Sequence, residues 1–189
     1  MGSGDQSNSK QGKSINTEDM QTTANLTIHS IFVKDISYES PSSPQAFSLP
    51  WEPQVKFDIQ VMRRLLEQEE SLHEVVLHAT VVAKLKIASN DTKNNVQQQE
   101  LVAFIADVKL GGLFTVKGLN SENLDQVLST TAPTILFPYL AETISSLVIR
   151  GGFPQFILPP IDFVALYQQR LHQSSNLGQT NTDGSVTVN

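Results

Sequence analysis

The sequence ILFPYLAETISSLVIRGGFPQFILPPIDF, residues 135–163, carries the most informative pattern in the chain. Its first half predicts a helix that is apolar on nearly every side, with Glu142 and Arg150 as its charged residues. Gly151-Gly152 predicts the end of that helix, and the proline- and aromatic-rich segment after it predicts a loop. A helix of this kind must be covered on nearly all sides, and one sheet layer cannot do that in so small a chain. The pattern therefore predicts that a second subunit covers part of the helix.

Upstream of the helix lie four long segments typical of β-strands: 26–39, 54–61, 73–87 and 100–119. They alternate apolar with polar side chains or are rich in β-branched residues. Polar turns connect most of them, and no helix is expected until after the fourth. The order predicts an α+β fold with a four-stranded antiparallel sheet packed with helices. Gly111-Gly112 in the fourth segment predicts a bulge or a sharp bend.

The first of these strands is expected to have two unlike faces. Asp35 and Glu39 share one parity, and strand geometry puts them on one side, about 13 Å apart. Ile31 and Val33 are expected on the same side as this acidic pair. The other parity holds a strongly apolar set: Leu26, Ile28, Phe32, Ile36 and Tyr38.

Further helices are predicted on both sides of the apolar one. A helix over 121–132 is expected to end at Pro133, and Pro138 is expected near the first turn of the apolar helix, where a missing N–H does least harm. Asp162 is expected to cap a final helix over 163–173.

Composition limits the classes of protein that are plausible. Residues 1–24 and 174–189 are polar and are expected to be disordered tails around a domain at 25–173. The chain has no cysteine and a formal charge of −6, which argues against thiolate metal sites and against nucleic acid as a partner. We expect no signal peptide and no membrane-spanning helix.

Catalytic and metal-binding motifs are not found in the sequence. HEVVLH at 73–78 lacks the i, i+4 histidine spacing of a zinc protease, and on a strand His73 and His78 point to opposite faces. Glu67, Glu69 and Glu70 lie in a polar turn, where a solvated charge run is the simpler reading. We therefore expect no enzyme activity, no cofactor and no metal.

Three blocks of sequence resemble the SecB family of protein-export chaperones. They are FVKDISYESP at 32–41, LPWEPQVKFDIQV at 49–61, and the segment 111–167, which contains GGLFTVKGL and the apolar helix with its GGFP turn. The likeness covers roughly residues 26–172. The last block is highly specific, because generic helix chemistry explains neither its prolines nor its turn.

The resemblance implies a concrete function. SecB-like proteins are cytoplasmic bacterial homotetramers, built as dimers of dimers. They hold unfolded precursor proteins without ATP and pass them to the ATPase SecA for export. Two alternatives stay open at this point. One is a SecB-like chaperone dedicated to a toxin–antitoxin partner, and the other is a homo-oligomeric interaction scaffold without chaperone activity.

The resemblance also implies roles for individual residues. Ile87 stands where the family usually has an acidic residue, which puts the geometry of the SecA contact in question. The implied client-binding residues are Trp51, Val55, Phe57, Ile59, Phe153, Phe156, Phe163, Leu166 and Tyr167. The implied SecA-binding residues are Asp35, Glu39 and Leu85. The implied subunit-interface residues are Phe137, Leu140, Ile144, Leu147 and Val148.

Overall fold

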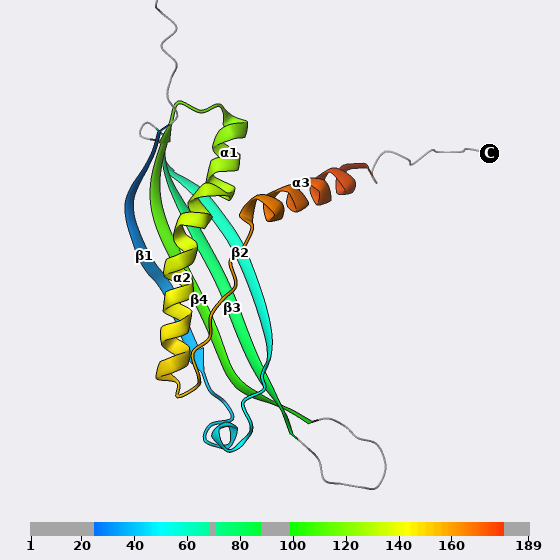
Figure 1. Cartoon of the computed structure of the whole chain (residues 1–189). Helices are drawn as coiled ribbons and strands as arrows, with labels where there is room; N and C mark the ends of the chain where they lie inside the picture. Colours follow the sequence, from blue (N-terminus) through cyan, green and yellow to red (C-terminus); the bar gives the residue numbers. More distant parts are fainter. Residues whose placement is uncertain (1–24, 69–70, 88–98, 180–189) are drawn as a thin grey trace, which may run out of the picture.

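The computed structural model describes residues 25–68, 71–87 and 99–179, so the predicted tail at 1–24 and residues 180–189 of the predicted tail at 174–189 lie outside the described residues. Figure 1 shows a long, curved sheet with helices along one face. The strands are β1 (Asn25–Glu39), β2 (Gln54–Glu67), β3 (Leu72–Ile87) and β4 (Gln99–Lys117). The helices are α1 (Ser121–Ser129), α2 (Thr131–Arg150) and α3 (Phe163–Gln179), with a short 3-10 turn at Gln45–Ser48.

The predicted four-stranded antiparallel sheet is confirmed. Its strand order is β1-β4-β3-β2, so β3 and β4 are central and β1 and β2 are the edges. Odd-numbered residues of β3, such as Leu77 and Val81, pair with even-numbered residues of β4 and are fully buried on one face. That face packs against α2, and we call it the helix face. The opposite side of the sheet is called the outer face.

Helix α2 uses only one stripe to reach the core of its own subunit. Leu136, Leu140, Ile144 and Val148 recur every four residues and are fully buried against β4 and β3. The prediction that Leu140, Ile144 and Val148 face a second subunit is therefore wrong, because these side chains have no surface left to offer. Among the predicted interface residues, Phe137 and Leu147 keep partial exposure.

The two ends of α2 are set by local chemistry. The helix starts at Thr131, so Pro133 lies in its first turn instead of ending the helix before it. Pro138 lies inside the helix and not near its first turn, which corrects that prediction too. Gly151 forms the predicted C-terminal cap, and Gly152 follows with a φ of 85°, a left-handed conformation that favours glycine.

Helix α3 begins where the sequence predicts. The carboxylate of Asp162 accepts hydrogen bonds from the backbone N–H groups of Val164 at 2.9 Å and Ala165 at 3.0 Å, which confirms it as the cap. The helix runs past the predicted domain end at residue 173 to Gln179. Figure 1 shows α3 projecting away from the sheet, past the β2 edge.

Strand β1 is not a regular strand, and this changes which side chains face the helices. The pairing with β4 shifts between Ile28 and Ser30 and again between Val33 and Asp35. Each shift adds one residue and reverses the alternation. As a result Ile31 and Val33 pair with even-numbered β4 residues on the helix face, whereas Phe32 lies on the outer face. The single-parity assignment of these three side chains is therefore wrong.

The glycine pair of β4 makes room for neighbouring side chains. The pairing of β4 with β1 and β3 shows no shift at Gly111 or Gly112, so the bulge, one of the two features predicted there, is wrong. A Cβ on Gly111 would lie 2.7 Å from the Phe32 ring, and a Cβ on Gly112 would lie 2.6 Å from the Phe114 ring and 2.8 Å from Leu136. Each glycine therefore lets a large apolar side chain pack directly on the strand.

The segment Ser121–Arg150 is long and apolar enough, by length and composition, to cross a membrane. The core helix of a water-soluble protein passes the same test. Here one stripe of the segment packs on the sheet, and 33% of the apolar window is buried in the subunit.

Candidate binding surfaces

The first candidate surface lies on the helix face along the β2 edge. Val55, Phe57 and Ile59 pair with Ala83, Val81 and Ala79 of β3, so all three point to the helix side. Their positions at the sheet edge leave them only partly covered, and Val55 is 38% exposed. The alternation predicted in the sequence is confirmed, and it produces a row of apolar side chains that lies open at one edge.

Beyond Ile59 this row continues into a groove beneath α3, with a volume of about 200 Å³. Leu166, itself 38% exposed, overhangs it from α3. The walls come from β2, α1 and α3: Ile59, Val61, Ser129, Phe163, Leu166, Tyr167, Gln169, Arg170 and Gln173. The structure thus brings Ile59 together with Phe163, Leu166 and Tyr167, which lie more than 100 positions later in the sequence.

An aromatic cluster supports the other end of the row. Trp51 packs against Phe153 with ring centroids 5.2 Å apart, and both lie near the buried Phe104. Phe47 packs on Phe153 at 5.0 Å and is itself half exposed. Phe47 is therefore the exposed part of this cluster, Trp51 is partly buried, and Phe153 is the buried part that holds them.

Two predicted client-binding residues have little surface of their own. Phe153 and Phe163 are buried in the subunit, at 5% and 3% exposure. The prediction that these two side chains contact the client is therefore wrong. They support the surface from beneath. Phe156 is half-buried, while its neighbour Ile157 is the most exposed large apolar side chain described. Sequence reasoning missed Ile157, because nothing in a proline-rich loop says which side chain points outward.

A polar tie holds α3 against the rest of the chain. Tyr167 donates a hydrogen bond from its hydroxyl to Asp125 of α1 at 2.9 Å. Arg63 of β2 forms an ion pair with the same carboxylate and donates to Ser129 Oγ at 2.6 Å. The hydrogen bond to Asp125 raises the pKa of Tyr167. The groove thus has a wall that is anchored by polar contacts near its surface and by Phe163 at its base.

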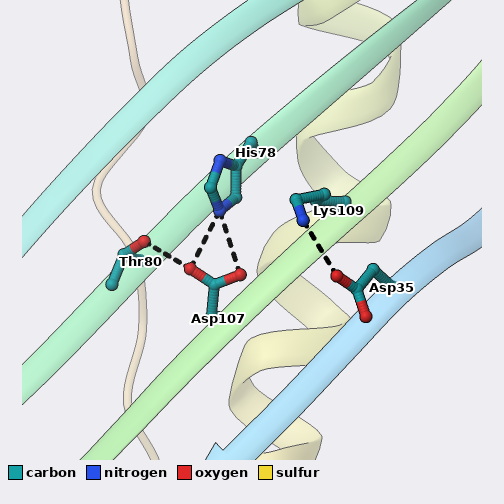
Figure 2. A network of polar contacts seen from close by, with 5 residues as sticks. All are labelled: Asp35, His78, Thr80, Asp107 and Lys109. Atoms are coloured by element: carbon teal, nitrogen blue, oxygen red, sulfur yellow. Dashed lines mark hydrogen bonds and ion pairs between the residues drawn. The ribbon is translucent and has the colours of Figure 1, made fainter.

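The second candidate surface lies on the outer face, where Figure 2 shows two neighbouring polar networks. Asp35 and Glu39 pair with Lys109 and Ile105 of β4 and share that face, as predicted. Asp35 accepts a hydrogen bond from Lys109 Nζ at 2.9 Å. Asp107 accepts from Thr80 Oγ1 at 2.7 Å and interacts with His78 Nε2 at 2.8 Å.

Leu85 does not belong to this surface. It is 1% exposed and lies on the helix face of β3, so its assignment as a SecA contact is wrong. Ile87 shares its parity and is half-buried, so the unusual residue there does not alter the outer face. The strand pairing instead puts Ile105 opposite Glu39, and Asp107 opposite Ser37, which lies between the two acidic residues of β1. Alternation along β4 hinted at their common face, but only the register shows that they adjoin the acidic pair.

The polar network lowers the pKa of Asp107. Burial raises this pKa, but the hydrogen bonds from Thr80 and His78 and the charge of Lys109 together outweigh burial. A carboxyl whose pKa is lowered on folding stabilises the fold above its unfolded pKa of about 3.9. That contribution is lost as the pH falls through the lower folded-state value.

We therefore expect Asp107→Asn to lower the free energy of unfolding at pH 7 by about 1 kcal/mol. The deficit relative to the parent protein should begin to shrink as the pH falls below about 4, where the carboxyl of the unfolded parent takes up its proton, and should vanish below the lower folded-state pKa of Asp107. Urea unfolding of parent and variant at pH 7 and at a pH below about 4, at the same protein concentration, measures the two free energies of unfolding. Asp58→Asn on the outer face of β2 is the matched control and should have little effect. An Asp107→Asn deficit that does not change with pH would contradict this account.

Comparison with known proteins decides the family. Residues 19–174 match the sequence profile of the family described as preprotein translocase subunit SecB. The chain belongs to the SecB family. Protein-export protein SecB of Legionella pneumophila is 39% identical over 159 residues, covering 84% of this chain and 89% of the relative. The corresponding proteins of Pseudomonas fluorescens and Methylococcus capsulatus are 37% and 34% identical and cover 91% and 99% of their own lengths.

A solved structure supports the fold of this SecB chain. The Mycobacterium tuberculosis SecB-like chaperone, in complex with a peptide from the HigA1 antitoxin, aligns with a TM-score of 0.53 and 16% identity. The alignment covers 72% of this chain and 90% of that one. The predicted resemblance is thus confirmed, and the SecB chain is a protein-export chaperone.

His73 and His78 face opposite sides of the sheet, and within 25–68, 71–87 and 99–179 no cluster of three metal-ligating side chains occurs.

Proposed function

We propose that this SecB chain holds unfolded precursor proteins without ATP and delivers them to SecA. The observation that carries the proposal is the open apolar row on the helix face. It runs from the aromatic cluster at Trp51, along Val55 and Ile59, to the groove beneath Leu166. Large exposed apolar surfaces of this kind are uncommon on monomers and are usual at binding sites.

The physical chemistry of the row suits an unfolded chain. Each apolar side chain buried in it gains about 25 cal/mol per Å² of area, and ordering the client opposes this gain. An extended segment places alternate side chains on one side, as β2 does, so several side chains can engage at once. Binding then selects for exposed apolar segments and slow folding, because it needs no particular sequence and no nucleotide.

Assembly as a dimer of dimers is part of the proposal. Helix α2 covers β3 and β4 but not the β1 edge, where Ile28, Val33 and Ile36 remain exposed. On α2 itself Tyr139 and Ile149 are also about half exposed. A second copy that covers this β1-side surface would remove these side chains from water. Grooves of several subunits would then act together on one client, which raises the overall affinity.

Delivery is assigned to the outer face. We assign the SecA contact to Asp35, Glu39 and Asp107, with Ile105 as an apolar neighbour. Lys109 pairs with Asp35, so this surface carries less negative charge than its acidic residues alone suggest. Isolated exposed pairs contribute about 1 kcal/mol or less, so the carboxylates must act as a group. The partner surface that suits them is basic.

We expect Asp35→Lys combined with Glu39→Lys to weaken SecA binding about tenfold or more, because two attractive charges become repulsive. Client binding should be unchanged, because the apolar row lies on the other face of the sheet. Asp58→Lys, on the outer face of β2, is the control for a charge reversal outside this surface. A titration of SecA against the parent and the two variants measures this, and equal SecA affinity for the double variant and the parent would refute the assignment.

Export is favoured over a dedicated toxin–antitoxin role. The relatives at 34–39% identity are all named protein-export proteins, whereas the chaperone bound to an antitoxin peptide is 16% identical. A cytoplasmic bacterial location goes with the export role, since precursors must be met before they cross the membrane.

A further inference from the structure

The outer face contains a second feature, which borders the proposed SecA contact at Lys109 and extends from there toward β2. It is a shallow pocket of about 320 Å³ near the Arg64 end of β2. Its lining combines an apolar floor with a cationic rim and comes from all four strands of the sheet: Lys34, Met62, Arg63, Arg64, Glu74, Val76 and Lys109.

Two of the four cations in this lining, Lys34 and Arg64, are held by one buried carboxylate, whereas Arg63 and Lys109 pair with Asp125 and Asp35. Glu74 is 5% exposed, and its two oxygens contact Lys34 Nζ and Arg64 Nε, both at 2.7 Å. The hydrogen bond from Lys34 lowers the pKa of Glu74 despite burial, so the carboxylate is charged at neutral pH. Two cations thus share one anion, and one positive charge is left over in a chain whose net charge is −6.

The guanidinium of Arg64 is ready for a second carboxylate. Its side chain is 65% exposed, and its contact with Glu74 uses the Nε donor. Among the described residues its terminal amino groups make no hydrogen bond. A guanidinium presents paired N–H donors that match a carboxylate in a two-point contact.

An apolar position lies at a fixed spacing from that arginine. Met62 and Arg64 are two residues apart on β2 and share the outer face, so their side chains start about 7 Å apart. Met62 is 41% exposed and lies directly opposite the nearly buried Val76. An extended peptide repeats its side chains on one side with the same spacing of about 7 Å.

We propose that this pocket binds an extended segment of a partner protein that carries a carboxylate side chain and an apolar side chain two residues apart. The carboxylate contacts the guanidinium of Arg64, and the apolar side chain covers Met62 and Val76. The required charge is opposite to that of a partner for the acidic residues Asp35 and Asp107. The outer face therefore has two contact regions of opposite preference.

The test uses the full chain and three labelled peptides. The first repeats Ser-Glu-Ser-Leu, the second has Lys in place of Glu, and the third has Ser in place of Leu. Fluorescence anisotropy should give the tightest binding for the first peptide, with an affinity that falls as salt is added. Arg64→Gln and Met62→Ser should each weaken it about fivefold, whereas Lys56→Gln on the same face of β2 should change it less than about twofold.

Two results would overturn the proposal. One is equal binding of the Glu and Lys peptides, which would mean that charge is not read. The other is binding of the Glu-Leu peptide that neither Arg64→Gln nor Met62→Ser weakens, which would locate it elsewhere, for example in the client row. Substitution of Met62 leaves the ion pairs of Glu74 with Lys34 and Arg64 intact, because Met62 takes no part in them. Circular dichroism checks that each variant is folded.

Discussion

Leu140→Glu is expected to unfold the subunit, and Tyr139→Glu is expected to leave it folded but unable to assemble. Leu140 is fully buried between α2 and the sheet, and its neighbour Tyr139 is 53% exposed. An unpaired carboxylate in the core costs several kcal/mol, which is comparable to the whole stability of about 5–15 kcal/mol for a domain. The same charge at position 139 meets water in the subunit and meets apolar surface only in an assembly.

Circular dichroism and light scattering separate the two outcomes. For Leu140→Glu we expect loss of the cooperative melting transition. For Tyr139→Glu we expect a native spectrum with a reduced mass. A folded Leu140→Glu protein of lower mass would contradict the structure, because it would mean that this stripe of α2 faces another subunit. A Tyr139→Glu protein of unchanged mass would remove the β1-side surface as the proposed interface.

Leu166→Asp should reduce the affinity for an unfolded precursor by about tenfold to a hundredfold. Leu166 overhangs the groove beneath α3, and burial of a leucine side chain is worth about 1.5–3 kcal/mol. An aspartate at this exposed helix position can stay in contact with water, but its charged side chain cannot pack against an apolar side chain of the client. The change should leave the fold intact, because Leu166 is 38% exposed in the subunit.

The control for this variant lies on the same helix. Val164 is 46% exposed and does not line the groove, so Val164→Asp introduces the same charge outside the client surface. Anisotropy titrations of a labelled, unfolded precursor compare the two proteins at one concentration. Equal losses for both would mean that charge, and not the groove, controls binding, and no loss for Leu166→Asp would remove α3 from the client site.

Much of the fold could be predicted because local patterns determine it. The alternation in β2 put Val55, Phe57 and Ile59 on one face, and the pairing with β3 confirms it. Gly151 and Asp162 mark helix ends because a cap is satisfied by chemistry within a few residues. These features depend on neighbours in sequence, so the sequence alone is enough.

The errors concern features that depend on distant partners. Two extra residues in β1 reverse its alternation, and the register with β4 decides where they fall. Leu85 and Asp107 lie on opposite faces of the sheet, and the pairing of β3 with β4 decides this. The residue type alone does not say which face either side chain points to. Helix α2 is apolar nearly all round, so its sequence could not reveal that Leu140 faces the sheet of its own subunit while Tyr139 faces outward.

The most direct test of the chaperone function is the refolding rate of a slowly folding, signal-bearing precursor, measured with and without excess of this protein and in the absence of nucleotide. The apolar row predicts a strong delay, because the bound precursor is withheld from folding. An intact oligomer that causes no delay would contradict the client surface and would favour an interaction scaffold or a chaperone dedicated to another partner.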